Sequence, residues 1–113
     1  MPRGIFLALT NPASDDVDAE FNQWYADVHS KEVLGLPGVR SCRRFRLASA
    51  QVMPGDDAAG RRYLALYEVD VDDWQGFTDS MQQGFANGSI TVDPNLLQLD
   101  PMVMTMVFEE VEG

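Results

Sequence analysis

The chain has 113 residues, 45% of them hydrophobic, and its 18 acidic and 8 basic residues give a formal net charge of −10. This length predicts one domain with a modest core. The charge argues against nucleic acid and anionic membrane as partners, because both require a positive surface. The single cysteine, Cys42, excludes an internal disulfide and a thiolate metal cluster. The apolar run at residues 5–9 is too short for a signal peptide or a membrane span, so we expect a cytoplasmic protein.

The first third of the chain predicts a strand followed by a helix. Residues 4–11 are rich in β-compatible side chains and are largely apolar on both alternating faces, which predicts the first strand. Ser14 or Asp15 can cap a helix that runs to about Leu34. The sequence Gly35-Leu36-Pro37-Gly38 then ends this helix.

Two strands joined by a long connection are predicted next. Residues 39–48 carry several arginines, and this charge predicts a strand at a sheet edge, where charge blocks unwanted pairing. Residues 49–60 contain proline, glycine and aspartate and predict a mobile connection. Residues 62–70 alternate regularly between two sets of side chains, which predicts the third strand.

The last third of the chain predicts a helix, a loop and a final strand. The helix begins near Asp72 or Asp73, carries apolar residues at helical spacing and ends at Asn87-Gly88. Residues 89–101 contain two prolines and several apolar residues. This loop must pack on something, and we expect it to pack against the partner or over the mouth of the cleft, where it would act as a lid. Residues 102–111 are again apolar on both faces and predict the fourth strand.

The order strand–helix–strand–strand–helix–strand predicts a ferredoxin-like α+β fold, with a four-stranded antiparallel sheet and two helices on one face. Two helices cover only one face of such a sheet. The first and fourth strands are nevertheless apolar on both faces, and a monomer rarely exposes so large an apolar surface. We therefore expect a homodimer in which a second copy covers the open face.

A narrow apolar stripe on the first helix is predicted to face the sheet. It consists of Val17, Phe21, Trp24 and Val28. Tyr25 and His29 lie one turn apart along one border of this stripe, and Glu32 follows His29 by three positions. Polar groups on that border face a cleft between helix and sheet. We therefore expect the functional site there.

His29, the only histidine of the chain, is the first candidate for chemistry. Imidazole gives or takes a proton near neutral pH, so His29 can act as a general acid or base. Tyr25 can orient the imidazole or share a substrate oxygen, and Glu32 can hold the second ring nitrogen. The alternative is a structural histidine that ties the helix to the sheet by a hydrogen bond.

Five further side chains are candidates for substrate binding. Trp24, Tyr63 and Tyr67 offer aromatic rings or hydroxyl groups, although aromatic residues at such positions more often pack in a core. Arg44 and Arg46 share one side of the second strand and can bind a carboxylate or phenolate through paired hydrogen bonds. Surface ion pairs with the abundant acidic residues are the alternative for these arginines.

Motifs for cofactor and metal binding are missing from the sequence. There is no glycine-rich phosphate loop, no Gly-x-Ser-x-Gly motif and no second histidine for a usual metal site. Asp70, Asp72 and Asp73 lie where the second helix needs its cap. Cys42 has no base beside it in the sequence, so we expect an inert side chain. We therefore predict no cofactor and no metal ion.

Several of these motifs together resemble the EthD-like branch of the dimeric α+β barrel superfamily. The resembling sequences are Trp24-Tyr25 followed by His29, Val33-Leu34, Leu36-Pro37-Gly38-Val39, Arg43-Arg44-Phe45 and Tyr63-Leu64-Ala65-Leu66-Tyr67-Glu68. Ser30-Lys31 departs from the apolar residue and proline that often follow the helix histidine in relatives. The resemblance implies a dimeric barrel. Members of this superfamily include small-molecule cyclases, isomerases, cofactor-independent oxygenases and haem-degrading enzymes.

The residues and the resemblance together predict a small, largely apolar pocket between the first helix and the sheet. We expect it to bind an aromatic or polyketide-like carbonyl compound. The predicted reaction is cofactor-independent acid–base chemistry, in which enolisation leads to cyclisation, isomerisation or elimination. His29 would be the base or acid, and Tyr25 the orienting donor. The alternatives are a non-catalytic protein that binds a small ligand, and a haem-degrading or cofactor-free monooxygenase.

Overall fold

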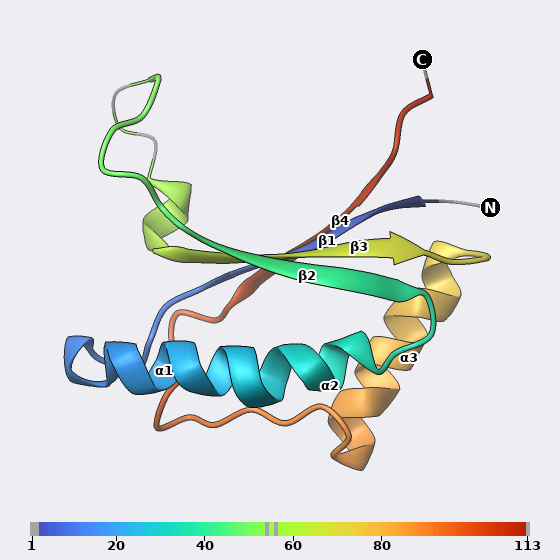
Figure 1. The fold of residues 1–113 in the computed structure, drawn as a ribbon, viewed down its shortest axis with the longest axis horizontal. Coiled ribbons are helices and arrows are strands. Elements are labelled where there is room, and N and C mark those ends of the chain that lie inside the picture. Colours follow the sequence, from blue (N-terminus) through green and yellow to red (C-terminus); the bar gives the residue numbers. More distant parts are fainter. Residues whose placement is uncertain (1–2, 54, 56, 113) are drawn as a thin grey trace.

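The structure of the chain, a computed structural model, describes residues 3–53, 55 and 57–112. Its strands are β1 (Arg3–Thr10), β2 (Val39–Arg46), β3 (Tyr63–Asp70) and β4 (Met104–Glu109). Its helical segments are η1 (Asp15–Val17), α1 (Asp18–Trp24), η2 (Tyr25–His29), α2 (Ser30–Leu34), η3 (Ala58–Gly60) and α3 (Trp74–Asn87). The predicted βαββαβ order is confirmed (Figure 1).

The four strands form one antiparallel sheet in the order β2-β3-β1-β4. β1 lies inside the sheet and pairs with both β3 and β4. β2 lies at an edge beside β3, as its arginines predicted. β4 spans Met104–Glu109 rather than the predicted residues 102–111, because its pairing with β1 extends only from the pair Leu9 and Met104 to the pair Gly4 and Glu109.

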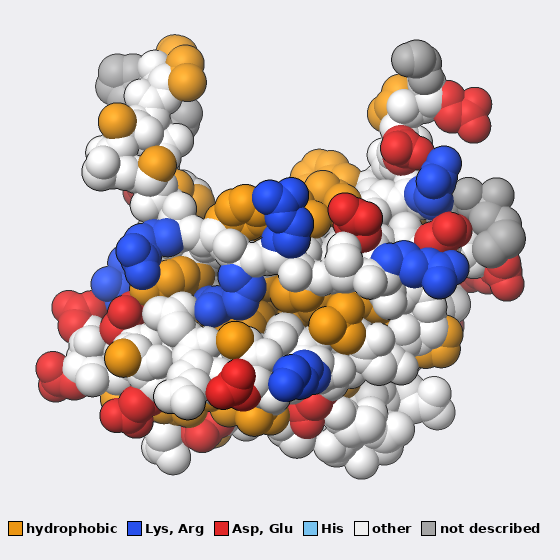
Figure 2. Space-filling model, viewed as in Figure 1, with side chains coloured by type: hydrophobic (Ala, Val, Ile, Leu, Met, Phe, Trp, Pro, Cys, Tyr) orange, Lys and Arg blue, Asp and Glu red, His pale blue; other side chains and the backbone are white. Residues whose placement is uncertain are grey.

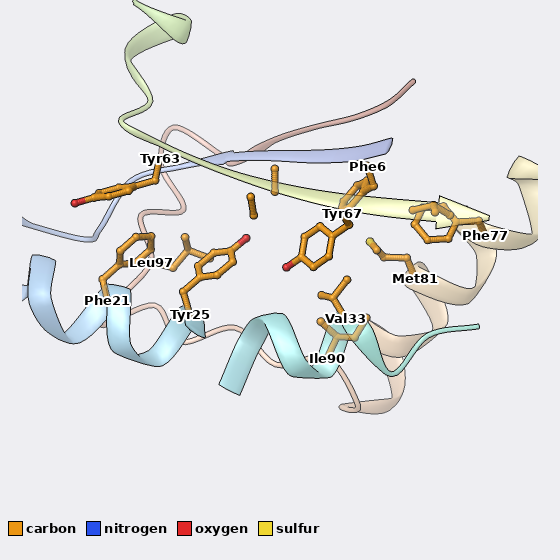
Figure 3. Close-up of a cluster of buried hydrophobic side chains, with 13 residues drawn as sticks. Phe6, Phe21, Tyr25, Val33, Tyr63, Tyr67, Phe77, Met81, Ile90 and Leu97 are labelled. Carbon is orange, nitrogen blue, oxygen red and sulfur yellow. The ribbon is translucent and has the colours of Figure 1, made fainter. Parts of the chain in front are cut away.

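The helices cover one face of this sheet, as predicted (Figure 1). η1, α1, η2 and α2 follow one another as a nearly continuous rod, and α3 lies beside this rod. The core fills the space between the helices and the sheet (Figure 3). β1 and β3 contribute aromatic rings to it through Phe6, Tyr63 and Tyr67, and the helices contribute Phe21 and Phe77.

Local signals at both ends of α3 agree with its observed limits. The carboxylate of Asp73 caps the helix by accepting a hydrogen bond from the Gly76 N–H at 2.6 Å. At the other end Gly88 has φ of +82°, the left-handed conformation that favours glycine. The predicted start near Asp73 and the predicted stop at Asn87-Gly88 are therefore confirmed.

The segment of residues 89–101 lacks a helix or strand but packs against the domain. Ile90 and Leu97 are buried, with 2% and 3% of their surfaces exposed. The carbonyl of Leu96 accepts a hydrogen bond from the Ala13 N–H at 2.7 Å, and the Gln98 N–H donates to the Asn11 carbonyl at 2.9 Å. The prediction that this segment must pack on something is confirmed, since it packs on its own domain. Its role as a lid stays a prediction.

The face of the sheet opposite the helices carries apolar side chains. Because side chains alternate along a strand, the residues between the buried ones point to this face. They are Ile5, Leu7, Leu9, Phe45, Leu64, Leu66, Met104, Met106 and Phe108, and we call this set the open sheet face. Phe45 and Phe108 expose 39% and 50% of their surfaces.

Two projections flank the open sheet face. The connection between β2 and β3 rises at one end of the sheet and the chain after β4 rises at the other (Figure 1). Hydrophobic side chains are visible between the two projections (Figure 2). Pro54 and Asp56 of the predicted mobile connection lie outside the described residues. Within the part of the chain that is described, no helix has the length and hydropathy needed to cross a membrane.

Candidate active site

The helical turn η2 positions the two residues predicted to carry chemistry. η2 is a π-helical turn, which contains one more residue than an α-helical turn. Side chains beyond it are therefore rotated backwards relative to a regular α-helix. As a result the buried face of the rod consists of Phe21, Tyr25, His29 and Val33, together with Ser30.

This register corrects the predicted apolar stripe. Val28 was expected to face the sheet, but 42% of its surface is exposed. Tyr25 and His29 were placed on the border of the stripe, yet only 1% and 8% of their surfaces are exposed. The prediction assumed α-helical spacing throughout, and the π-helical turn displaces every later side chain. The polar residues therefore lie deeper than the sequence indicated.

His29 is held between two aromatic rings and a backbone carbonyl. The Trp24 ring stacks on the imidazole with centroids 5.0 Å apart, and the Tyr25 ring meets it edge-on at 4.9 Å. The imidazole Nδ1 lies 2.9 Å from the carbonyl oxygen of Thr91. A carbonyl oxygen only accepts hydrogen bonds, so Nδ1 must carry the proton. In the neutral imidazole Nε2 then keeps its lone pair and can accept a proton.

Burial lowers the pKa of His29 below its ordinary value of 6.5. The hydrogen bond to Thr91 and the charge of Glu32 oppose this effect, whereas the charge of Arg44 adds to it. The imidazole is therefore neutral at neutral pH, with Nε2 as the basic atom. A base of this kind keeps its function somewhat below pH 6.5.

The lowered pKa predicts a pH dependence of stability. Between pH 6.5 and the pKa in the folded state, the unfolded chain binds a proton at His29 that the folded chain does not bind. The contribution of His29 to the free energy of unfolding is complete above pH 6.5 and is lost as the pH falls through this window. The expected slope is at most about 1.4 kcal/mol per pH unit. Chemical denaturation of the parent and of His29→Gln across pH 4–8 measures it, because the variant lacks this slope.

A cavity of about 760 Å³ opens next to His29. It lies between the helices, the sheet and the 89–101 segment, and it reaches the β4 edge, where Met106 joins its lining. Its volume falls within the range of small-molecule sites. The described lining residues are mostly apolar, and no aspartate, glutamate, lysine or arginine is among them. Tyr25, His29 and Tyr67, all predicted site residues, line this cavity.

Two phenols meet beside the imidazole. The hydroxyls of Tyr25 and Tyr67 point toward one another (Figure 3). The Tyr67 hydroxyl is buried near Tyr25 and Cys42 without a hydrogen bond of normal geometry. Burial raises the pKa of Tyr25 to about 12, against the opposing effects of Tyr67 and Arg44. Burial and the neighbouring Tyr25 and Cys42 raise the pKa of Tyr67 further. Both phenols therefore stay protonated at neutral pH and can donate hydrogen bonds.

Arg44 and Tyr63 lie on the far side of Tyr25 and do not line the cavity. The Arg44 guanidinium stacks over the Tyr25 ring at 4.4 Å, and its Nη1 donates to the Asn22 side chain at 2.9 Å. The Tyr63 hydroxyl donates to the Asp18 carboxylate at 2.6 Å and accepts from the Asn22 amide at 3.1 Å. These polar groups join α1 to β2 and β3.

The other predicted binding residues also lie outside the cavity lining. Arg46 is exposed and stacks over the Tyr63 ring at 5.7 Å. Trp24 supports the imidazole from outside. Glu32 was expected to hold the second imidazole nitrogen, but the Thr91 carbonyl occupies that position and Glu32 instead accepts hydrogen bonds from Thr91. This finding corrects the predicted contact.

Sequence reasoning missed part of the cavity lining. α3 contributes Phe77, Met81 and Phe85, which the sequence had shown only as apolar residues at helical spacing. The 89–101 segment contributes Leu97 and Leu99, which had been recognised as apolar residues in need of a partner. The contact of Thr91 with His29 had no local signal, since the two residues are 62 positions apart.

Comparisons by sequence do not place the chain in a family. No model of a known protein family matches it, and no protein with curated information does.

Solved structures of similar fold cover nearly the whole chain. HapK from Hahella chejuensis is 14% identical, with a TM-score of 0.63 over 97% of this chain and 94% of that one. An EthD family protein from Bacillus halodurans is 16% identical, with a TM-score of 0.58 over 98% and 100%. A dimeric ferredoxin-like protein of unknown function from Thermobifida fusca is 12% identical, with a TM-score of 0.56 over 96% and 92%. The predicted resemblance is confirmed at the level of the fold: this chain has the ferredoxin-like α+β fold that it shares with the EthD family protein from Bacillus halodurans and the ferredoxin-like protein from Thermobifida fusca.

Proposed function

We propose that the protein is a small-molecule enzyme that carries out cofactor-independent acid–base chemistry on an aromatic or polyketide-like carbonyl compound. One observation carries this proposal: His29 lines a cavity whose described wall has no carboxylate, ammonium or guanidinium group, with Nδ1 occupied by a carbonyl and Nε2 available as a base. The expected outcomes of the reaction are cyclisation, isomerisation or elimination.

The proposed reaction begins with removal of a proton from the carbon next to the substrate carbonyl. Nε2 of His29 accepts this proton, and the electrons of the broken C–H bond form an enolate. The Tyr25 hydroxyl is the proposed hydrogen-bond donor to the enolate oxygen, because it lines the same cavity and its ring contacts the imidazole. The imidazolium then returns the proton to the rearranged product.

The lack of charged side chains among the described lining residues limits the proposed substrate class. An ionised ligand loses its hydration on entry and finds no described side chain of opposite fixed charge in the lining. The net charge of −10 further disfavours anions. We therefore infer that the substrate is an uncharged compound with one hydrogen-bonding group near His29.

This inference predicts a difference between two matched fluorescent probes. N-phenyl-1-naphthylamine is uncharged, whereas 1-anilinonaphthalene-8-sulfonate differs from it by one sulfonate. The uncharged probe should bind at least about tenfold more tightly, since the sulfonate would be buried without a partner. Fluorescence titration gives both dissociation constants. Ala8→Leu, which narrows the cavity, should weaken binding of the uncharged probe, whereas Val28→Asp, at an exposed position of the rod outside the cavity lining, should not. Tighter binding of the sulfonate would contradict the substrate class.

A catalytic assay needs no knowledge of the natural substrate. The compound 1-tetralone is an uncharged bicyclic aromatic ketone with exchangeable hydrogens next to its carbonyl. If His29 removes such hydrogens, the protein will exchange them for deuterium in D₂O, which proton NMR follows directly. Probe binding without catalysed exchange in a panel of uncharged aromatic ketones would support the alternative, a non-catalytic binding protein.

We also propose that the protein is a homodimer assembled through the open sheet face. One solved structure with this fold is described as dimeric. In this chain the open sheet face presents apolar side chains from all four strands, more than a monomer usually exposes. Because Met106 belongs both to this face and to the cavity lining, a second copy would lie next to the cavity.

A further inference from the structure

We propose that Glu32 is a positioning residue, which holds Thr91 so that the Thr91 carbonyl fixes the His29 imidazole in the tautomer with a free Nε2. This inference rests on the proposed function in that it assigns Nε2 the role of the base. It goes beyond that function because it assigns a role to a carboxylate outside the cavity and to the 89–101 segment.

The carboxylate of Glu32 binds Thr91 through both its backbone and its side chain. Oε1 accepts a hydrogen bond from the Thr91 N–H at 3.0 Å and from the Thr91 hydroxyl at 2.8 Å. Oε2 lies 3.1 Å from the same hydroxyl. Hydrogen bonds to an ionised acceptor are stronger than those between neutral groups. One carboxylate therefore anchors a residue that lies in no helix or strand.

The anchored residue in turn holds the imidazole. The Thr91 carbonyl is 2.9 Å from Nδ1 of His29, so a single residue of the 89–101 segment is bound by two residues of the rod. His29 and Glu32 are three positions apart on adjoining helical segments, which places both side chains on the side of the rod that meets Thr91. Loss of the carboxylate contacts would free Thr91 to move away from the imidazole.

The position of Thr91 matters because the tautomer decides which nitrogen is basic. With Thr91 in place, Nδ1 carries the hydrogen and Nε2 can accept a proton. Without it, Nε2 can carry the hydrogen instead, and the lone pair then lies on the side of Thr91. The same segment supplies Val92, Leu97 and Leu99 to the cavity lining, so the anchor also keeps the cavity wall next to the base.

Two variants of Glu32 can separate its effect on the position of Thr91 from the effect of its charge on the His29 imidazole. Glu32 and Arg44 are the charged groups that act on the imidazole, with opposite effects on its pKa. The adjacent phenols, Tyr25 on η2 and Tyr67 on β3, remain neutral. Glu32→Gln removes the negative charge but keeps an oxygen that accepts from the Thr91 N–H. Glu32→Ala removes both the charge and the acceptor.

NMR of the imidazole nitrogens tests the proposal directly, because His29 is the only histidine. In ¹⁵N-histidine-labelled protein above the pKa of His29, the parent should show Nδ1 protonated and Nε2 unprotonated. In Glu32→Ala the ratio of this tautomer to the other should fall by roughly tenfold, about the effect of one hydrogen bond. Glu32→Gln should stay close to the parent. Glu20→Ala, an equal change of charge at an exposed position of α1, should leave the ratio unchanged.

Several outcomes would overturn the proposal. They are an Nε2-protonated imidazole in the parent, an unchanged ratio in Glu32→Ala, and a Glu32→Gln ratio equal to that of Glu32→Ala, which would indicate a charge effect alone. Exchange of 1-tetralone adds a second readout, in which Glu32→Ala should lower kcat with little change in KM. A Glu32-dependent tautomer without ketone exchange by the parent would defeat the proposed function and keep the positioning role. Ketone exchange by the parent, together with a tautomer ratio that is unchanged in Glu32→Ala, would keep the proposed function and defeat the positioning role.

Discussion

Replacement of His29 by glutamine is expected to slow the catalysed exchange of 1-tetralone hydrogens by about 10²–10⁴-fold, the usual contribution of a general base. Glutamine has a similar size and can still donate a hydrogen bond to the Thr91 carbonyl, so the contact between the rod and the 89–101 segment is kept. The melting temperature at pH 7 should therefore change by only a few degrees. NMR in D₂O measures the exchange rate, and circular dichroism measures the melting temperature.

Two comparisons make this result specific to catalysis. Binding of N-phenyl-1-naphthylamine should be nearly the same in His29→Gln, since the cavity keeps its shape. Tyr25→Phe keeps the buried ring but removes the hydroxyl, so it should slow exchange less than His29→Gln does. Parent-like exchange in His29→Gln would rule out His29 as the base. A large loss of stability with no effect on exchange or binding would support the structural alternative, a histidine that ties the rod to the 89–101 segment.

The charge-introducing substitution Leu66→Asp is expected to convert the proposed dimer into a monomer at micromolar concentration. Leu66 lies on β3 and points to the open sheet face, away from the helices. An uncompensated charge inside an interface costs about 3–5 kcal/mol, which corresponds to a dimer dissociation constant at least about 100-fold higher. Analytical ultracentrifugation measures the dissociation constant.

The control for this experiment is Val28→Asp, which introduces the same charge at an exposed apolar residue on the helical side. This variant should remain a dimer. Circular dichroism should show that Leu66→Asp keeps its secondary structure, because the core lies on the opposite face of β3. A parent protein that sediments as a monomer would contradict the argument from the open sheet face. A dimeric Leu66→Asp would place the interface elsewhere.

The sequence alone determined the order of the elements and most of their limits. Asp73 and Gly88 delimit α3, and the arginines of residues 39–48 predicted the sheet edge. These features depend on caps, turns and alternation, which involve residues a few positions apart. The two-sided apolar pattern of β1 and β4 also predicted the open sheet face, since alternation directly assigns side chains to faces.

Only the tertiary structure decided the depth and the contacts of the site. The π-helical turn at Tyr25–His29 brings His29 onto the buried face beside Tyr25, and it leaves Val28, which α-helical spacing had placed on that face, exposed. The choice between an α-helical and a π-helical turn depends on packing against the sheet, which helical periodicity does not contain. The position of Arg44 behind Tyr25, outside the cavity, likewise depends on how the rod crosses β2.

The contact between His29 and Thr91 shows most clearly what local sequence patterns do not contain. The sequence identified His29 and Glu32 as neighbours on one helix, and it identified the 89–101 segment as a loop that must pack. It could not show that Thr91 lies between the two side chains, because that contact joins residues about 60 positions apart. Local patterns determine which elements form and which faces are apolar. The meeting of a base, its carbonyl partner and a cavity is decided only when distant segments pack together.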